Sequence, residues 1–321
     1  MSNFSFKISG GLRGRLRLFT TDETGKITKD TGFFNNLITD AGLDQLGTYN
    51  PETTAYNMPF IGTIAFVGTG NTPPAYTDTA LTSYLASSNY NNSGAFATST
   101  YTPAGTNPGY ISWTATYTFP AGTATGTLAE VGIGELAAPS PGTNILFSHA
   151  LIVDGSGNPT TITVLSNEQL NVVYELQLVI DPTIQTGTIT YNSVTYNLSW
   201  LPSNVSTSCA GPISLSDTGS GSNWMFSVFN GTIQGITQTP TGNSTQNGTQ
   251  PALSSYTSGS YFITATWSGT INDWNLSGGI SAMLVQHNLG FPYQIGISPA
   301  IPKTNFYSMT FSCTFSWNRY P

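Results

Sequence analysis

The sequence predicts an all-β protein made of antiparallel β-sandwich domains of a jelly-roll-like type, with two short helices in the N-terminal part. Three observations predict this class. Apolar residues recur at every second position in several segments, the pattern of a strand with one buried face. Gly, Asn, Ser and Pro separate these segments, as is typical of sandwiches and barrels. The chain has 321 residues, 38% hydrophobic and 12% aromatic, enough for substantial cores.

The first predicted strand contains the segment GLRGRLRLF, residues 11–19. Arg13, Arg15 and Arg17 project from one face because side chains alternate along a strand. The leucines at the other parity face the core: Leu12, Leu16 and Leu18. The arginine face has two interpretations, a solvated surface or an electrostatic docking strip for an acidic partner. The second is of interest because the strip gathers three of only eight basic residues.

Two Asp-Thr-Gly triplets, at Asp30 and Asp217, raise the alternative of an aspartic protease, in which two carboxylates share a proton. The second triplet is followed by a Ser and then by Trp224, as in such enzymes. In the first, Phe33 stands where a Ser or Thr is expected. Asp-Thr-Gly is also ordinary turn chemistry, because Asp bonds to backbone amides and Gly accepts a positive φ. We interpret both triplets as turns, with Phe33 and Phe34 as core or interface anchors.

Two helices are expected before residue 90. The segment 39–47 has Thr39 as a possible N-cap residue and Gly47 as its end. The segment 76–86 begins at Thr77 or Asp78. It places three residues on one stripe: Leu81, Tyr84 and Leu85.

The remaining strands follow from strict alternation. The apolar positions of these strands are Ile111 to Phe119, Val172 to Ile180, Tyr261 to Trp267 and Tyr307 to Trp317, each taken at every second residue. The segment WMFSVF, residues 224–229, gives a further strand, with Trp224, Phe226 and Val228 on the core face. The polar stretches 87–109 and 235–259 are predicted to be long loops that provide contact surfaces.

A domain boundary is predicted near residues 181–187. The strand ending at Ile180 runs into Asp181-Pro182, and Pro does not continue a central strand. Beyond this point the only acidic residues are Asp217 and Asp273. We therefore expect two domains, 1–181 and 182–321.

Composition restricts the function. Charged residues make up 7% of the chain and the net charge is −7, which argues against nucleic-acid binding. No run approaches the roughly 20 apolar residues of a membrane span. The N-terminal segment lacks the apolar stretch of a signal peptide, so synthesis in a cytoplasm is expected.

The residue types that carry enzyme or metal chemistry are sparse. The two cysteines form no disulfide framework, and Cys313 is expected to be a buried reduced thiol. His149 and His287 are isolated in strand-like runs and are expected to be ordinary core or surface residues. Glu130 and Glu135 form a carboxylate pair without a recognisable cleft. No cofactor, metal site or catalytic residue is expected.

Five stretches resemble structural proteins of tailed bacteriophages of the tail and tail-fibre type. They are 30–47 (DTGFFNNLITDAGLDQLG), 67–86 (VGTGNTPPAYTDTALTSYLA), 128–135 (LAEVGIGE), 146–176 and 297–320. The stretches are spread along most of the chain, and 187–290 is the least recognisable part. The motifs are fairly specific for a phage virion protein, but they carry no catalytic residues.

The resemblance implies a non-enzymatic virion protein, a tail or tail-fibre component that acts in assembly and in adsorption to the host surface. Residues 1–181 would attach to the particle, and residues 182–321 would face other subunits or the host. The implied partners are other virion proteins, further copies of the chain in a homotrimer, and a host-surface glycan or protein. The alternatives are a capsid decoration or head-fibre protein and, least favoured, the aspartic protease.

Overall fold

The computed structural model describes residues 3–48, 62–89, 97–98, 102, 109–135, 145–205, 225–247, 250–286 and 291–320. The chain forms two compact units. Unit 1 comprises residues 1–10, 99–111 and 179–318, and unit 2 comprises 11–98, 112–178 and 319–321. The chain passes from unit 2 to unit 1 between residues 178 and 179, near the predicted domain boundary. The units are not two consecutive halves of the sequence, because unit 1 also includes residues from the N-terminal half.

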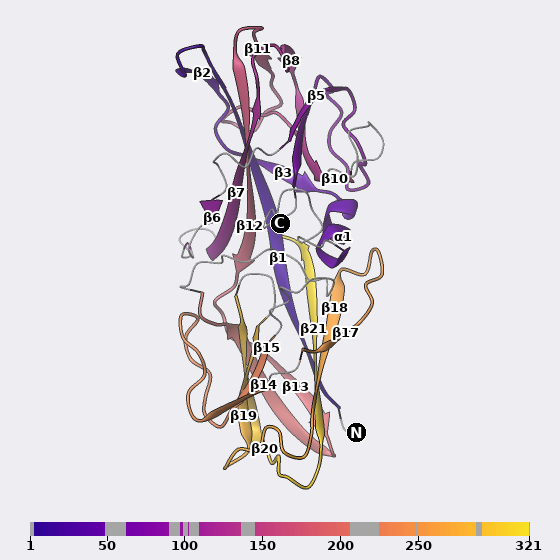
Figure 1. The fold of residues 1–321 in the computed structure, drawn as a ribbon, viewed down its shortest axis with the longest axis vertical. Coiled ribbons are helices and arrows are strands. Elements are labelled where there is room, and N and C mark those ends of the chain that lie inside the picture. The colour runs from indigo at the N-terminus through magenta and orange to yellow at the C-terminus, as the bar shows by residue number, and fades with distance from the viewer. Residues whose placement is uncertain are drawn as a thin grey trace. The chain divides into compact units, whose positions relative to one another are not determined.

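Unit 2 contains the helix and most of the earlier strands (Figure 1). Its elements are β2 (Ile27–Asp30), β3 (Phe34–Ile38), α1 (Asp40–Thr48), β4 (Ile64–Gly68), β5 (Tyr84–Asn89), β6 (Ala97–Thr98), β8 (Gly126–Leu128), β9 (Glu130–Glu135), β10 (Ile145–Leu151) and β11 (Ile162–Val164), with most of β7 (Gly109–Phe119) and β12 (Gln169–Ile180) and the later part of β1 (Asn3–Thr21). The strand order is β1-β3-β10-β9-β4-β5. Strand β12 pairs with β1 and β7.

Unit 1 contains a six-stranded antiparallel sheet of order β13-β14-β20-β19-β15-β16. These strands are β13 (Gln185–Tyr191), β14 (Val194–Pro202), β15 (Met225–Phe229), β16 (Ser244–Asn247), β19 (Ile280–Gln286) and β20 (Tyr293–Ile301). A second group has the order β17-β18-β21-β1, with β17 (Ala252–Leu253), β18 (Phe262–Gly269) and β21 (Met309–Arg319). Strands β13 and β14 form a hairpin through Asn192 and Ser193, both with positive φ, the geometry that matches strand twist.

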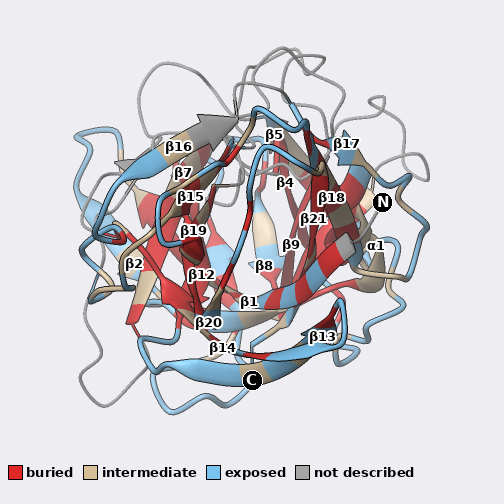
Figure 2. Cartoon of the chain, turned by 90° about the horizontal axis from the view of Figure 1, so that it is seen from below, coloured by how far each residue is buried: buried red, intermediate tan, exposed pale blue. Residues whose placement is uncertain are grey.

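Aromatic side chains join the two groups of strands in unit 1. Phe226 of β15 stacks on Trp267 of β18 at 5.1 Å between ring centroids. It also contacts Phe311 of β21 at 4.9 Å and Trp274 at 5.3 Å. Phe226, Trp267 and Phe311 are at most 1% exposed, so these rings form the centre of the unit's core. Figure 2 shows by colour which residues of these strands are buried.

The alternation used to predict strands is confirmed. Ile111, Trp113, Ala115, Tyr117 and Phe119 of β7 are all fully buried. The same holds for the core-face residues of β18 and β21, including Cys313, whose thiol is free and buried. Burial raises the pKa of that thiol, which keeps it protonated. The all-β antiparallel class is therefore confirmed.

One of the two predicted helices forms. Helix α1 begins at Asp40, after Thr39, whose Oγ1 accepts a hydrogen bond from the Gly42 N–H at 2.9 Å, as predicted for the N-cap residue. The helix ends at Thr48, one residue past the predicted Gly47. Gly42 permits close packing, since a Cβ there would lie 2.2 Å from the carbonyl oxygen of Phe147.

The second predicted helix, 76–86, is wrong. Residues 76–83 form turns and irregular backbone, and β5 begins at Tyr84. Two tertiary interactions override the helical stripe. Strand β5 pairs with β4, with Ala86 opposite Val67. The backbone N–H groups of Thr82 and Ser83 donate to the carboxylate of Glu130 instead of to helical carbonyls.

Trypsin should leave the C-terminal strand in place. No Lys or Arg lies between Lys29 and Lys303. Lys303 is 3% exposed and donates to the Thr304 carbonyl at 2.9 Å and to Asn275 Oδ1 at 3.0 Å. Lys26 is exposed in the turn between β1 and β2. Native digestion followed by mass spectrometry should therefore show cleavage after Lys26 first, while cleavage after Lys303 should require unfolding. Early release of residues 304–321 would show that β21 is not part of the core.

Candidate functional site

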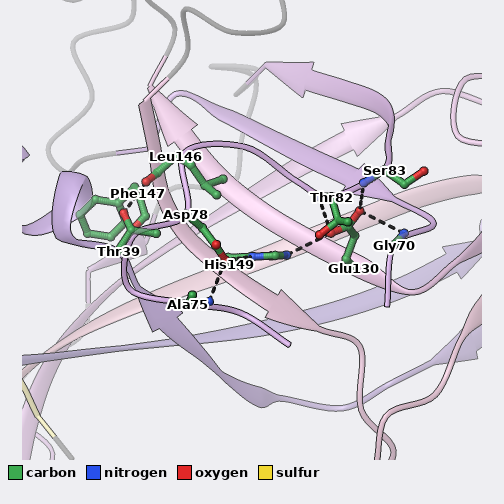
Figure 3. A network of polar contacts seen from close by, with 10 residues as sticks. All are labelled: Thr39, Gly70, Ala75, Asp78, Thr82, Ser83, Glu130, Leu146, Phe147 and His149. Carbon is green, nitrogen blue, oxygen red and sulfur yellow. Dashed lines mark hydrogen bonds and ion pairs between the residues drawn. The ribbon is translucent and has the colours of Figure 1, made fainter. Parts of the chain in front are cut away.

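A buried histidine lies between two carboxylates in unit 2 (Figure 3). His149, on β10, is 1% exposed. Its Nε2 lies 3.1 Å from Glu130 Oε2, and its Nδ1 lies 2.7 Å from Asp78 Oδ2. Glu130 is fully buried, whereas the Asp78 side chain is 25% exposed. We call Asp78, Glu130 and His149 the Asp–His–Glu cluster.

Backbone amides complete the surroundings of Glu130. Its carboxylate accepts hydrogen bonds from the N–H groups of Gly70 at 3.0 Å, Thr82 at 3.0 Å and Ser83 at 2.6 Å. Gly70 is required by proximity, because a Cβ there would lie 2.5 Å from Glu130 Oε1. Asp78 Oδ2 likewise accepts the N–H of Ala75 at 2.8 Å. The cluster therefore holds the irregular segment 69–83 against strands β9 and β10.

The polar atoms of the cluster face one another. Each ring nitrogen of His149 lies within hydrogen-bond distance of a carboxylate oxygen, and Glu130 also accepts three backbone N–H groups. Both ring nitrogens are thus engaged within the chain. This arrangement suits a structural network of buried polar groups.

The sequence does not predict this cluster. His149 is a buried residue of a strand, in agreement with the prediction of a core or surface histidine, but its carboxylate partners do not follow from the sequence. The predicted partner of Glu130, Glu135, has a side chain outside the described part. Glu130 and Asp78 are 19 and 71 residues from His149 in the sequence, and the three follow no known motif spacing. Within the described residues, no group of three or more His, Cys, Asp or Glu is arranged to hold a metal ion. His287 and Cys209 lie outside the described residues.

The predicted arginine strip lies on β1, and each arginine contacts a side chain of its own chain. Arg13 Nε donates to Gln177 Oε1, and Arg15 Nη2 pairs with Glu175 Oε2 at 2.7 Å. Arg17 Nε donates to Asp30 Oδ1 at 2.9 Å. The opposite leucines are buried, as predicted: Leu12, Leu16 and Leu18. The arginine side chains of the two ion pairs remain about one-third exposed, at 34% and 32%.

The two phenylalanines predicted as anchors differ. Phe34 is 7% exposed and belongs to the core. Phe33 is 42% exposed, with the Arg15 guanidinium 4.9 Å from its ring centroid. This stacking places Phe33 on the same surface as the arginine strip. Whether the surface docks a partner stays a prediction.

Asp30 is the last residue of strand β2, directly before the turn that the sequence predicted. Its Oδ1 accepts the Gly32 N–H at 2.9 Å, and Gly32 has φ of 67°. The hydrogen bond from Arg17 lowers the pKa of the Asp30 carboxyl despite partial burial. Asp30 is thus an ion-pair partner of Arg17. Asp217 and Trp224, the rest of the protease alternative, lie outside the described residues.

A second buried carboxylate gives a pH prediction. Burial alone would raise the pKa of Glu168, but hydrogen bonds from Lys29, Thr28 and the Leu165 backbone outweigh it and lower that pKa to about 2. The folded-state pKa is below the ordinary 4.5, so the stabilisation is complete above pH 4.5. It is lost as the pH falls toward 2, by about 2–3 kcal/mol.

The measurement is urea unfolding of the Glu168→Gln variant across that pH range. We expect the variant to be less stable than the parent above pH 4.5 and to lose less stability on acidification. Glu23→Gln, at an exposed carboxylate in the neighbouring turn, is the control and should retain the parent's acid sensitivity. Equal pH slopes for Glu168→Gln and the parent would contradict the assignment.

Comparison with protein-family models, with curated proteins and with solved structures finds no match for this chain. Among the helices in the described part of the chain, none has the length and apolar character needed to cross a membrane.

Proposed function

We propose that this chain is a non-enzymatic structural protein of a bacteriophage virion, a tail or tail-fibre component. The supporting observation is that several of the stretches that resemble phage proteins meet at one place in the fold, the Asp–His–Glu cluster. Stretch 67–86 supplies Asp78, stretch 128–135 supplies Glu130, and stretch 146–176 supplies His149. Stretch 30–47 joins them through Thr39, whose hydroxyl donates to the Leu146 carbonyl at 2.5 Å. Segments far apart in sequence thus make one scaffold.

The chemistry of this meeting point favours assembly over catalysis. If the motifs shared with phage proteins were catalytic, a nucleophile, acid or base among them would face a cleft. Here the polar groups of the Asp–His–Glu cluster bind one another and backbone amides, so the phage-like motifs support the fold. The resemblance would then reflect a common structural core.

The composition fits a contact protein of a particle. A surface with few charges forms contacts through hydroxyl and amide groups, which salt screens little. In the proposal, residues 1–181 attach to the virion and residues 182–321 face other subunits or the host, in a homotrimer. The aromatic contacts between the strand groups of unit 1 support a β-sandwich, and we propose a jelly-roll type for it.

Immunogold electron microscopy of phage particles tests the location. Antibodies against this chain should label the tail or its fibres. Label on the head would favour the alternative of a decoration or head-fibre protein. Absence of the chain from purified particles, checked by mass spectrometry, would overturn the proposal.

The arginine strip gives a sharper test of attachment. The double variant Arg17→Gln with Asp30→Asn removes a part-exposed ion pair without leaving either charge unpaired. If the strip docks an acidic partner, incorporation into particles should fall, because the Arg17 guanidinium is no longer there to donate to that partner. A matched double variant, Lys26→Gln with Asp22→Asn in the nearby turn, is the control. Unchanged incorporation of the folded Arg17 variant would assign the strip to the solvated surface.

A further inference from the structure

A groove of about 750 Å³ opens on unit 1, between the outer face of the six-stranded sheet and the segment 230–233. Its floor is formed by β13, β14 and β20. The outer side of β13 is largely exposed (Figure 2). The described residues that line the groove include no Asp, Glu, Lys, Arg or His. The described lining is therefore uncharged.

Strand register places the polar side chains of the floor in two rows. Thr188, Asn197 and Ser298 are directly opposite one another across β13, β14 and β20. Thr186, Ser199 and Gly296 form the next row, two residues along. Partners in such a row have Cβ atoms about 5 Å apart. Gly296 has no side chain, so its backbone lies next to Ile233. A Cβ at position 296 would be 3.5 Å from the Ile233 side chain.

The floor side chains are available to a ligand. Four hydroxyls and one side-chain amide of the floor have no hydrogen-bond partner among the described residues. They belong to Thr186, Thr188, Ser199, Ser298 and Asn197. These groups each combine donor and acceptor capacity. The floor thus offers five unengaged polar side chains on a rigid sheet.

The wall is held in place by other polar groups. Asn230 accepts from the Asn243 N–H at 2.8 Å, and Ser281 donates to the Gly231 carbonyl at 2.6 Å. The buried Gln294 accepts from the Gln234 N–H at 2.7 Å and donates to its carbonyl at 2.9 Å. The segment 230–234 is therefore braced before any ligand arrives, which lowers the entropic cost of binding.

The chemistry of the groove selects a class of ligand. An ionic ligand would lose hydration without meeting an opposite charge. A wholly apolar ligand would leave the floor hydroxyls without partners, which costs free energy. A neutral polyhydroxylated ligand satisfies both conditions, because its hydroxyls donate and accept while its C–H face packs on Ile233. A chain of neutral sugar units has this chemistry.

We propose that this groove binds a neutral saccharide chain through Asn197, Ser199 and the threonines of β13. The inference deepens the proposed function, since such a site would serve adsorption to a glycan surface. It concerns the isolated protein, so its test does not depend on where the chain sits in a particle.

The test is NMR titration of the full-length, deuterated chain with maltohexaose, mannohexaose and xylohexaose, and with hexagalacturonate as a charged counterpart. At least one neutral hexasaccharide should shift the backbone amide signals of β13, β14 and segment 230–233 in a saturable way. Hexagalacturonate should not. The Asn197→Ala variant should weaken binding about tenfold, the loss expected for one or two hydrogen bonds.

Thr195→Ala is the matched control, because Thr195 lies on the same strand and face two residues away and does not line the groove. It should bind like the parent, and far-UV circular dichroism should show both variants folded. The proposal is overturned if no neutral hexasaccharide shifts these signals at millimolar concentration. It is equally overturned if hexagalacturonate binds the groove better, or if Asn197→Ala and Thr195→Ala bind alike. Labelling of the virion tail without saccharide binding would leave the proposed function standing alone.

Discussion

Replacing Glu130 with alanine should lower the free energy of unfolding of unit 2 by about 3–5 kcal/mol, because it leaves several buried polar groups without their partner at about 1–3 kcal/mol each. The substitution removes the carboxylate that faces Nε2 of His149 and leaves three backbone N–H groups without their acceptor. The backbone donors of Thr82 and Ser83 are part-buried, so water replaces the carboxylate incompletely. Differential scanning calorimetry and urea titration measure the loss.

Two companion variants separate the causes. Glu130→Gln keeps one acceptor oxygen and should be intermediate. Asp154→Ala removes an exposed carboxylate that also accepts backbone N–H groups, from Ser156 at 2.8 Å and Asn158 at 3.0 Å, and should cost much less. If Glu130→Ala and Asp154→Ala are equally stable, burial of the Asp–His–Glu cluster does not hold the segment 69–83.

Replacing Phe226 with alanine should destabilise unit 1 by about 3–5 kcal/mol, the usual cost of a Phe→Ala cavity in a core. Phe226 is fully buried and contacts aromatic rings on β18 and β21, so its loss removes part of the aromatic contact between the two strand groups. Tryptophan fluorescence during urea unfolding suits the measurement, because five of the six tryptophans belong to unit 1.

Phe229→Ala is the matched control on the same strand. Phe229 is only half-buried and has the opposite parity along β15, so its side chain is on the other face of the sheet. We expect a loss of about 1 kcal/mol there, from the partial burial of the ring. Comparable losses in the two variants would mean that the Phe226 face is not the centre of the core.

Local patterns predicted the strands well and the long-range partners poorly. The alternation in β7, β18 and β21 is visible in the sequence because each strand has one buried face. The Thr39 N-cap residue was also predictable, since its hydrogen bond is made within three residues. The prediction of a helix at 76–86 was wrong because hydrogen-bond partners on β4 and β9, far away in the sequence, outweigh the apolar stripe of that segment.

The candidate sites depend on contacts that no spacing reveals. Arg15 meets Glu175 across 160 residues, and His149 meets Asp78 across 71. The groove in unit 1 could not be predicted without the strand register. Its residues Thr188, Asn197 and Ser298 become neighbours only when β13, β14 and β20 are aligned. The composition did indicate its character, since the second half of the chain is almost free of charge.

The division of the chain between the units has a consequence for its synthesis. Unit 1 takes residues from both ends of the sequence, with Ser316 Oγ donating to the Ile8 carbonyl across 308 residues. Unit 2 is closed by Arg319, which pairs with Asp40 and donates to the Ile38 carbonyl at 2.6 Å. Neither unit is complete until β21 has left the ribosome. Each unit therefore forms its full core only after residues near both ends of this sequence have been synthesised, and contacts of such long sequence separation slow folding.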